Sequence, residues 1–367
     1  MKKIKVALLL CLTALALGGC KKEKAVETET AAQTQAATEE SETTLQIEPE
    51  TEDTEHSYLT GKKVDPSIGR KRPIAVMLNN ISAACPQAGI AKADVVYEAP
   101  VEGGITRLMG IFEDYAGMEK IGSVRSCRDY YVRYALEFDA IYMHFGQAVY
   151  AFDLLNSEKV NNISGLEYQE EAGKIQGYAG EDIFYRTSDR PSPHNVYTSE
   201  ESIKTAIKRK EYRTDYAPEY KGHYKFASDG ETVSLTGGTA THIEPGYEVN
   251  EPDFEYNAED HLYYRSQYGD AQIDQLTEKQ LAYTNVIFQV SKWENYDDNG
   301  YLNIDTVSGG EAYVFSNGTY VKGTWKKESE DAPARYYDGD GKEITLNQGK
   351  TWVCIIQDTY QDKISFS

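Results

Sequence analysis

Continuous apolar runs alternate with helical periodicity in the first half of the chain. The runs cover four segments: Pro73–Leu78, Ala93–Ala99, Ile105–Phe112 and Ala140–Phe145. Runs of this length without a polar face predict strands that are buried on both sides of a sheet. Amphipathic helical stretches follow two of them, one from Cys127 and one over 148–155. Strands that alternate with helices predict an α/β-type layer with a mixed sheet.

The helix predicted from Cys127 follows a short basic segment. Ser126 and Asp129 have capping-box spacing, which places the helix start near Cys127. Its apolar face recurs at helical spacing, in Cys127, Tyr131, Tyr134, Ala135 and Phe138.

Two arginines flank the first turn of this helix. Unpaired backbone N–H groups and the helix dipole favour an anion there. Arg125 and Arg128 therefore predict a carboxylate or phosphate site, with Ser126 between them. The alternative is that both guanidinium groups pair with the chain's own acids, such as Glu98 or Glu102.

Polar side chains follow several of the apolar runs. Asn79 and Asn80, Glu98, and His144 stand at or near the ends of predicted strands. In open α/β sheets, ligands bind beyond such strand ends. Every strand must end in something polar, so the pattern by itself does not decide whether these residues form a ligand site.

A proline-rich segment at 189–195 (DRPSPHN) predicts a rigid loop. Two prolines fix φ twice within three residues and exclude a helix or central strand. Such a loop can present Arg190, His194 and Asn195 to a ligand, or it can serve only as a stiff connector. A helix is predicted from about Ser199, with Thr198 and Glu201 at capping-box spacing.

From about residue 223 the pattern changes to short strands with turn signals. The extended segments are expected at 223–227, 285–291, 311–315, 320–325 and 351–357. Asn317-Gly318 predicts a tight hairpin turn, and Asp338-Gly339-Asp340-Gly341 predicts another turn without the rest of a calcium loop. This half predicts a β-rich domain.

The first residues predict a lipoprotein signal. Three lysines precede an apolar segment, Val6–Leu17, which is too short for a mature membrane anchor. The following Leu17-Gly18-Gly19-Cys20 resembles a bacterial lipobox, in which the cysteine is diacylated and becomes the first mature residue. Cys20 is therefore expected to anchor the protein on the extracytoplasmic face of the cell membrane.

The segment after Cys20 is acidic and poor in apolar residues. Residues 21–60 carry three lysines against eleven acids, and residues 61–367 keep a formal net charge of −16. This composition predicts a disordered tether. The acidic remainder excludes nucleic acid as a partner, so an anion site must be a local group of arginines.

These patterns together predict an α+β fold. The expected parts are a signal peptide over 1–20, a disordered acidic linker over 21–65, an N-terminal α+β domain with a mixed sheet over 66–222 and a smaller β-rich domain over 223–367. Widely spaced cysteines predict neither a disulfide framework nor a zinc site, although a Cys85–Cys127 bridge stays open. We expect no metal and no cofactor.

Several motifs resemble the YerB-like lipoproteins of Gram-positive bacteria. The matching stretches are RPIAVMLNN at 72–80, ADVVYEAPVEGGITRLMGIF at 93–112, IGSVRSCRDYY at 121–131, DRPSPHNVYTS at 189–199, GGEAYVFSNGTYVKGTWKK at 309–327 and LNQGKTWV at 346–353. The resemblance implies an N-terminal α+β domain and a smaller C-terminal domain outside the membrane, with no established reaction. Ser123, Cys127 and Asp129 depart from a family pattern closer to G-P-V-R-S-A-R-P.

Three function classes remain open. The first is binding of an anionic or polar cell-envelope ligand or partner, with Arg125, Arg128, Ser126, Glu98, His144, Arg190, His194 and Asn195 as the expected site. The second is a cell-wall hydrolase or transferase that uses Glu98 with Glu102, or Cys127 with His144 or His194. The third is a scaffold in an envelope protein assembly. Without an accepted catalytic signature, the chain is not expected to be an enzyme.

Overall fold

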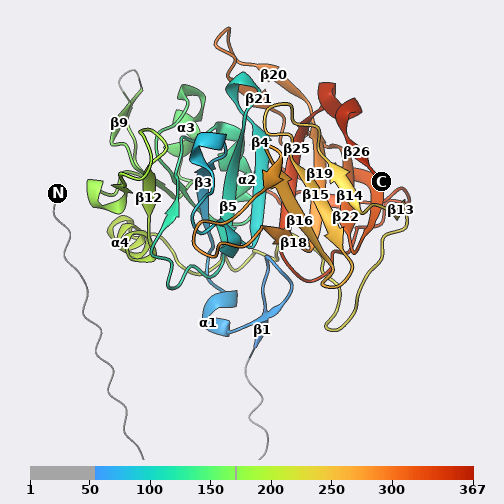
Figure 1. Ribbon diagram of the computed structural model, residues 1–367. Coiled ribbons are helices and arrows are strands. Elements are labelled where there is room, and N and C mark those ends of the chain that lie inside the picture. Colours follow the sequence, from blue (N-terminus) through green and yellow to red (C-terminus); the bar gives the residue numbers. More distant parts are fainter. Residues whose placement is uncertain (1–53, 170–171) are drawn as a thin grey trace, which may run out of the picture. The chain divides into compact units, whose positions relative to one another are not determined.

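Strands from both halves of the sequence form one mixed sheet in the computed structural model, which describes residues 54–169 and 172–367 (Figure 1). In spatial order its strands are β13 (Gly238–Thr239), β23 (Thr319–Lys326), β22 (Gly310–Ser316), β19 (Asn285–Ser291), β25 (Thr351–Gln357), β4 (Val95–Pro100), β5 (Thr106–Phe112), β3 (Ile74–Asn79), β7 (Ile141–His144) and β8 (Asn162–Ser164). β24 (Arg335–Tyr337) pairs with β23 at one end.

The strand nearest the C-terminus joins the two halves of this sheet. β25 pairs in parallel with β19 on one side and with β4 on the other. β3 also pairs in parallel with β7, and β7 with β8, whereas β5 is antiparallel to both of its neighbours, β4 and β3. The central sheet is mixed, as the sequence predicted.

Both faces of the sheet are buried, which explains the continuous apolar runs. In β3, Ala75 and Met77 belong to one apolar cluster, whereas Val76 and Leu78 belong to a second cluster. All six residues of β4 and all seven of β5 are buried. The four runs predicted as strands in the first half are confirmed as β3, β4, β5 and β7.

Two helices cover opposite faces of the N-terminal half of the sheet. α2 (Asp129–Leu136) packs Tyr131 and Tyr134 into the first cluster, and α4 (Glu200–Lys210) packs Ile203 and Ala206 into the second. The stretch predicted as a helix over 148–155 contains a 3-10 turn, Val149–Ala151, and α3 (Phe152–Leu155).

The expected helix starts need two corrections. α2 begins at Asp129 rather than near Cys127, and its N-cap residue Arg128 makes no side-chain capping bond. The predicted Ser126 capping box does not form, because the Ser126 hydroxyl donates to Phe145 O at 3.2 Å. α4 is present where predicted, but Ser199 rather than Thr198 caps it.

A second sheet packs beside the C-terminal half of the central sheet (Figure 1). It contains β17 (Asp270–Ala271), β16 (Leu262–Gln267), β15 (Asp253–Asn257), β14 (His242–Glu244), β26 (Ser365–Phe366) and β18 (Ala282–Tyr283).

Asn317 and Gly318, with φ of 53° and 67°, form the predicted turn between β22 and β23. The expected strand at 223–227 is wrong, since only Phe226 there forms a bridge, with Leu346.

The smaller elements connect these layers. They include α1 (Pro66–Gly69), three antiparallel strand pairs and a three-stranded sheet. The pairs are β1 (Glu55–His56) with β2 (Lys63–Val64), β9 (Tyr168–Gln169) with β10 (Gly173–Lys174), and β20 (Trp293–Asn295) with β21 (Leu302–Ile304). The three-stranded sheet consists of β11 (Tyr185–Arg186), β12 (Val196–Thr198) and β6 (Ile121–Gly122).

The predicted linker extends too far toward the C-terminus. β1 pairs with β2, and Leu59 between them is fully buried in the first apolar cluster. Residues 54–65 therefore belong to the fold, and they differ from the acidic segment before them in having as many lysines as acids and in containing Tyr58, Leu59 and Val64. The signal peptide, Cys20 and residues 21–53 lie outside the described residues.

Cys85, Cys127 and Cys354 are free thiols, so the bridge left open between Cys85 and Cys127 is not formed. Among the residues that the structure describes, no helix has the length and apolar character needed to span a membrane.

Candidate functional site

The segment 122–128 runs between three strands and sets the position of its arginines. Val124 N donates to Val196 O at 2.7 Å, Arg125 N donates to Met77 O at 3.0 Å, and Phe145 N donates to Arg125 O at 3.0 Å. The backbone of Arg125 is thus fixed against the residues next to β12, β3 and β7. Its guanidinium is carried by a rigid support.

Arg125 has no acidic partner among the described residues. Its side chain is half-buried, its Nη1 donates to Pro193 O at 3.4 Å, and its Nε is buried without a hydrogen bond. Burial lowers the pKa of Arg125, and the charges of Arg128 and Arg186 lower it further. A guanidinium with unused donors in a positive environment is suited to an anion.

Arg107 lies next to this segment and was not among the residues predicted from the sequence. It is only 7% exposed. Its Nη1 donates to Ser126 O at 2.6 Å. Burial lowers its pKa to about 10, the charges of Arg128 and Arg125 lower it further, and the charge of Glu102, which Arg128 holds, acts against them, so Arg107 stays charged at neutral pH. A buried charge without a counter-charge is expensive unless a ligand supplies one.

The segment 186–195, which contains the proline-rich loop, adds further polar side chains to this region. Arg186 of β11 donates to Asn195 Oδ1 at 2.8 Å, and its guanidinium lies 5.2 Å from the centroid of the Phe145 ring. His194 Nδ1 lies 2.8 Å from Asn79 Nδ2. Partial burial lowers the pKa of His194, as do the charges of Arg125 and Arg190.

Arg190 holds the loop in place. Its Nη1 donates to Ala84 O, and its Nη2 donates to Pro86 O at 2.6 Å. These bonds tie the loop to the turn that follows β3. The loop is thus held in place, which both predictions for it require: a stiff connector and a loop that presents side chains.

The arginines of this region differ from the other described arginines in lacking a carboxylate partner. Twelve arginines lie in the described residues, and eight of them form ion pairs with carboxylates. The four without such a pair are Arg107, Arg125, Arg186 and Arg190, and we call them the arginine cluster. All four lie around the segments 122–128 and 186–195, in a chain whose formal net charge is −21.

Arg128 faces the same region but is neutralised. Its Nε donates to Glu102 Oε1 at 2.6 Å, its Nη2 donates to Glu102 Oε2, and its Nη1 donates to Cys127 O at 2.8 Å. Burial acts to lower the pKa of Arg128, but the hydrogen bonds and charge of Glu102 outweigh it, and the pKa is raised. Glu102 is thus the internal counter-ion at one end of the group.

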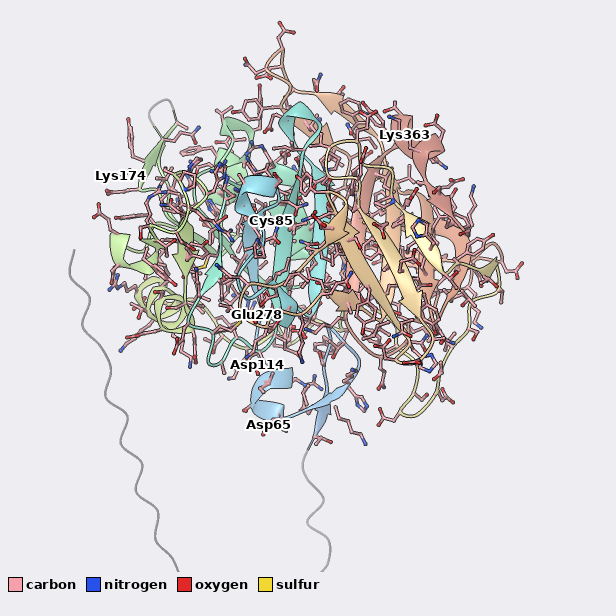
Figure 2. All side chains as sticks on the ribbon, viewed as in Figure 1. Asp65, Cys85, Asp114, Lys174, Glu278 and Lys363 are labelled. Carbon is pink, nitrogen blue, oxygen red and sulfur yellow. The ribbon has the colours of Figure 1, made fainter. Side chains whose placement is uncertain are left out.

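Glu98 belongs to a different, fully buried network. Its Oε2 accepts from Arg265 Nη2 at 2.8 Å, and its Oε1 accepts from Thr106 Oγ1 and from Asn250 Nδ2, both at 2.8 Å. Neither Glu98 nor Arg265 is exposed to solvent. Cys85 (Figure 2) borders the network, where its sulfur accepts from Gln267 at 3.4 Å.

His144 and Cys127 are also enclosed. His144 is fully buried, with Nδ1 2.9 Å from Gly146 O and Nε2 3.2 Å from Asn162 Oδ1. Burial raises the pKa of the Cys127 thiol to about 12, so it is protonated at neutral pH and poorly suited to nucleophilic attack. Glu98 and Glu102 each pair with an arginine, and the structure brings no acid–base pair of the predicted kind together at the surface.

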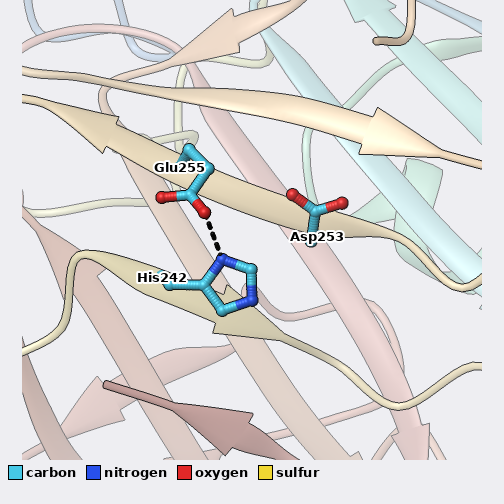
Figure 3. Close-up of side chains that lie close together, drawn as sticks. All are labelled: His242, Asp253 and Glu255. Carbon is cyan, nitrogen blue, oxygen red and sulfur yellow. Dashed lines mark hydrogen bonds and ion pairs between the residues drawn. The ribbon is translucent and has the colours of Figure 1, made fainter. Parts of the chain in front are cut away.

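A third polar group lies on the second sheet. His242 of β14 and Asp253 and Glu255 of β15 bring three potential metal-ligand atoms within 4.8 Å of one another (Figure 3). His242 Nδ1 lies 2.5 Å from Glu255 Oε1, and its Nε2 lies 3.1 Å from Glu244 Oε1. Partial burial acts to lower the pKa of His242, but these carboxylates raise it overall. The arrangement is that of an ion-paired imidazolium.

The arginine cluster was only partly accessible to sequence reasoning. Arg125, Arg190, His194 and Asn195 were predicted, and the structure brings them together. Arg107 was missed, although a charged residue inside the apolar run ITRLMGIF was a usable signal. Arg186 carried no local signal. Cavities of about 450 to 840 Å³ occur elsewhere in the described part of the chain, and none of the four arginines lines them.

Comparisons with known proteins agree with the motifs. Residues 59–213 match the N-terminal domain, and residues 243–353 the C-terminal domain, of a family described as "Protein of unknown function (DUF3048)". The chain is 31% identical over 312 residues to "Putative lipoprotein YerB" of Bacillus subtilis (strain 168), covering 84% of this chain and 88% of the relative. The crystal structure of YerB from Bacillus subtilis matches with a TM-score of 0.73 and 30% identity, over 85% of this chain and 99% of that one.

Proposed function

The chain belongs to the DUF3048 family, and we propose that it is a lipid-anchored extracytoplasmic protein that binds an anionic ligand of the cell envelope through its arginine cluster. The lipobox-like sequence ending at Cys20 and the lipoprotein name of the YerB relative support the anchor. The anchor would hold the binding site close to the envelope components that it meets.

One observation carries the binding proposal. The four arginines that lack a carboxylate partner in the described chain gather in one place, and one of them, Arg107, is almost fully buried. Desolvating a guanidinium costs free energy unless a counter-charge compensates. In a chain with 59 acidic and 38 basic residues, chance pairing should have supplied an acid. An external carboxylate or phosphate would complete the site.

The chemistry of the donors defines the ligand class. Guanidinium groups match carboxylate and phosphate oxygens in bidentate fashion. Arg125 has a buried Nε without a partner, and Asn195 Oδ1 accepts from the neighbouring Arg186 at 2.8 Å and so helps to position a second guanidinium of the cluster. Wall polymers, peptidoglycan stem peptides and partner-protein carboxylates all carry such anions.

Arg125→Ala tests the proposal directly. The chain expressed from Lys21 is titrated with inorganic phosphate and is sedimented with fragmented cell walls. Loss of one charge-assisted contact should weaken phosphate binding by about one to two decades. The melting temperature should change little, because no carboxylate loses its partner.

Arg209→Ala is the matched control. Arg209 is exposed and pairs with Asp182 outside the cluster, so its removal should leave phosphate and wall binding at the wild-type level. Equal binding by wild type, Arg125→Ala and Arg209→Ala would overturn the site. A loss of binding shared by both variants would instead indicate general charge attraction.

A further inference from the structure

A cavity of about 560 Å³ lies beside α4, apart from the arginine cluster. Its apolar wall consists of Tyr115, Ile141, Ile207 and Tyr212. Ile141 and Ile207 are core residues, so the floor of the cavity is continuous with the second apolar cluster. The volume falls in the range of small-molecule sites, which are mostly apolar with a few placed polar groups.

The rim of this cavity is basic. Lys204 and Lys208 stand one turn apart on α4, and Lys71 lies across the opening. Within the described residues, Lys208 has no ion pair and no side-chain hydrogen bond. Lys204 pairs with Glu200, and Lys71 pairs with Asp215 at 2.6 Å, but both pairs are solvent-exposed and such pairs are weak.

The remaining charged groups do not cancel this rim. Arg72 also lines the cavity, but it is paired with Asp139 at 3.3 Å and donates to Asn161 Oδ1 at 2.7 Å, so its charge is neutralised within the chain. Glu211 is the one carboxylate residue among those that line the cavity. Of the four cations that line the cavity, Lys208 is thus the one without an ion pair among the described residues, next to an apolar wall.

We infer that this cavity binds a small amphiphile with one apolar chain or ring and an anionic head group. The apolar part would lie against Tyr115, Ile207 and Tyr212, where it leaves water. The head group would meet the Lys208 ammonium, whose charge has no internal partner. A fatty carboxylate and an alkyl phosphate share this chemistry.

Octyl phosphate and octanoate are the probes, used at monomeric concentrations in calorimetric titrations of the chain that begins at Lys21. Both anions should bind saturably, and neutral octyl glucoside, acetate and inorganic phosphate should bind this cavity at least about tenfold more weakly. Lys208→Gln should weaken the anionic amphiphiles by about tenfold. Lys210→Gln removes an equal charge from the same helix outside the cavity and should leave binding unchanged.

Thr214→Trp gives a second and sterically different test. Thr214 is exposed and lines the cavity, so the larger side chain should fill the opening without disturbing the core. Binding should then disappear while the melting temperature is retained. Equal binding by octyl glucoside, equal effects of the two lysine variants, or no binding of either anion would refute the inference. A preference for octanoate or for octyl phosphate would identify the head group.

Discussion

Individual charged residues in this protein differ mainly in what neutralises them. Glu98 and Arg265 neutralise each other inside the core at 2.8 Å, whereas Arg107 is almost as deeply buried and forms no ion pair among the described residues, since the nearby Glu102 is held by Arg128. Burying a pair costs much less than burying a single charge. Arg107 is therefore the residue whose environment most requires an external anion.

Glu102→Gln tests whether the internal counter-ion competes with the ligand. Glu102 holds Arg128 through two hydrogen bonds at the edge of the arginine cluster. Its neutralisation should tighten inorganic phosphate binding by about threefold to tenfold, since Arg128 becomes available. The unpaired Arg128 should also cost about 3 kcal/mol of stability. Thermal unfolding with and without phosphate measures both effects. Phosphate should raise the melting temperature of the variant more than that of the wild type. Unchanged phosphate affinity would separate Arg128 from the site.

Glu113→Gln tests a buried carboxyl group on the opposite side of the structure. Burial raises the pKa of Glu113 to about 7, and nearby Asp94 adds to the shift. Because the folded state binds this proton more tightly, the free energy of unfolding should fall as pH rises from about 4.5 to 7. Glutamine cannot ionise, so the variant should avoid this fall in the free energy of unfolding, which amounts to up to about 3 kcal/mol.

Denaturant unfolding at pH 5 and pH 8 measures the difference. The variant should gain stability relative to wild type at pH 8 and much less at pH 5. Glu119→Gln, at an exposed glutamate of the following segment, serves as the control. A gain of the same size at both pH values would exclude the titration of Glu113 as its cause.

Among the elements, strands were easier to locate from the sequence than helix starts. A strand buried on both faces appears in the sequence as an uninterrupted apolar run, as in β3, β5 and β25. A helix start depends on which hydroxyl turns back to the backbone. Ser126 donates instead to Phe145, a residue brought close only by β7.

Ser199→Ala measures the cap that α4 uses. The Ser199 Oγ accepts from Ser202 N at 3.3 Å. Its loss should cost about 1 kcal/mol, which corresponds to a melting-temperature decrease of about 2–4 °C in a chain of this length. Glu201→Ala should have little effect, because Glu201 does not complete a capping box. The reverse order of the two variants would restore Thr198 and Glu201 as the cap.

For the whole molecule, the first described residues and β25, the last strand of the central sheet along the chain, hold that sheet together. β25 completes the sheet between β4 and β19, and residues 54–60 close one edge of the core with Leu59. β25 is far in sequence from β4, and Gly349 N, just before β25, donates to Thr60 O at 2.8 Å. The fold therefore depends on both ends of the described chain.

Two N-terminal truncations separate the linker from the fold. A chain that begins at Thr54 keeps β1 and Leu59, whereas a chain that begins at Gly61 loses both. Loss of a buried leucine costs about 2–5 kcal/mol, so the shorter chain should melt several degrees lower. Identical melting curves would show that residues 54–60 do not stabilise the core.

Cys20→Ala tests the anchor. If the lipobox operates, the variant should appear as released or uncleaved protein in membrane fractionation, because the apolar signal is too short to serve as a mature anchor. A variant that is processed and retained like the wild type would contradict lipidation at Cys20.

The sequence by itself determined the features that depend on neighbouring residues. The buried strands, the helix after Ser199, the Asn317-Gly318 turn and the family motifs all follow from patterns within a few residues. The sequence also shows Arg125 close to Arg128, but it could not tell which of the two arginines has an acidic partner. Only the tertiary structure decided that Arg128 pairs with Glu102, 26 residues away, and Glu98 with Arg265, 167 residues away, while Arg125 keeps no acid. Charge neutralisation acts through space, so it is fixed by the contacts of the folded chain and not by spacing along it.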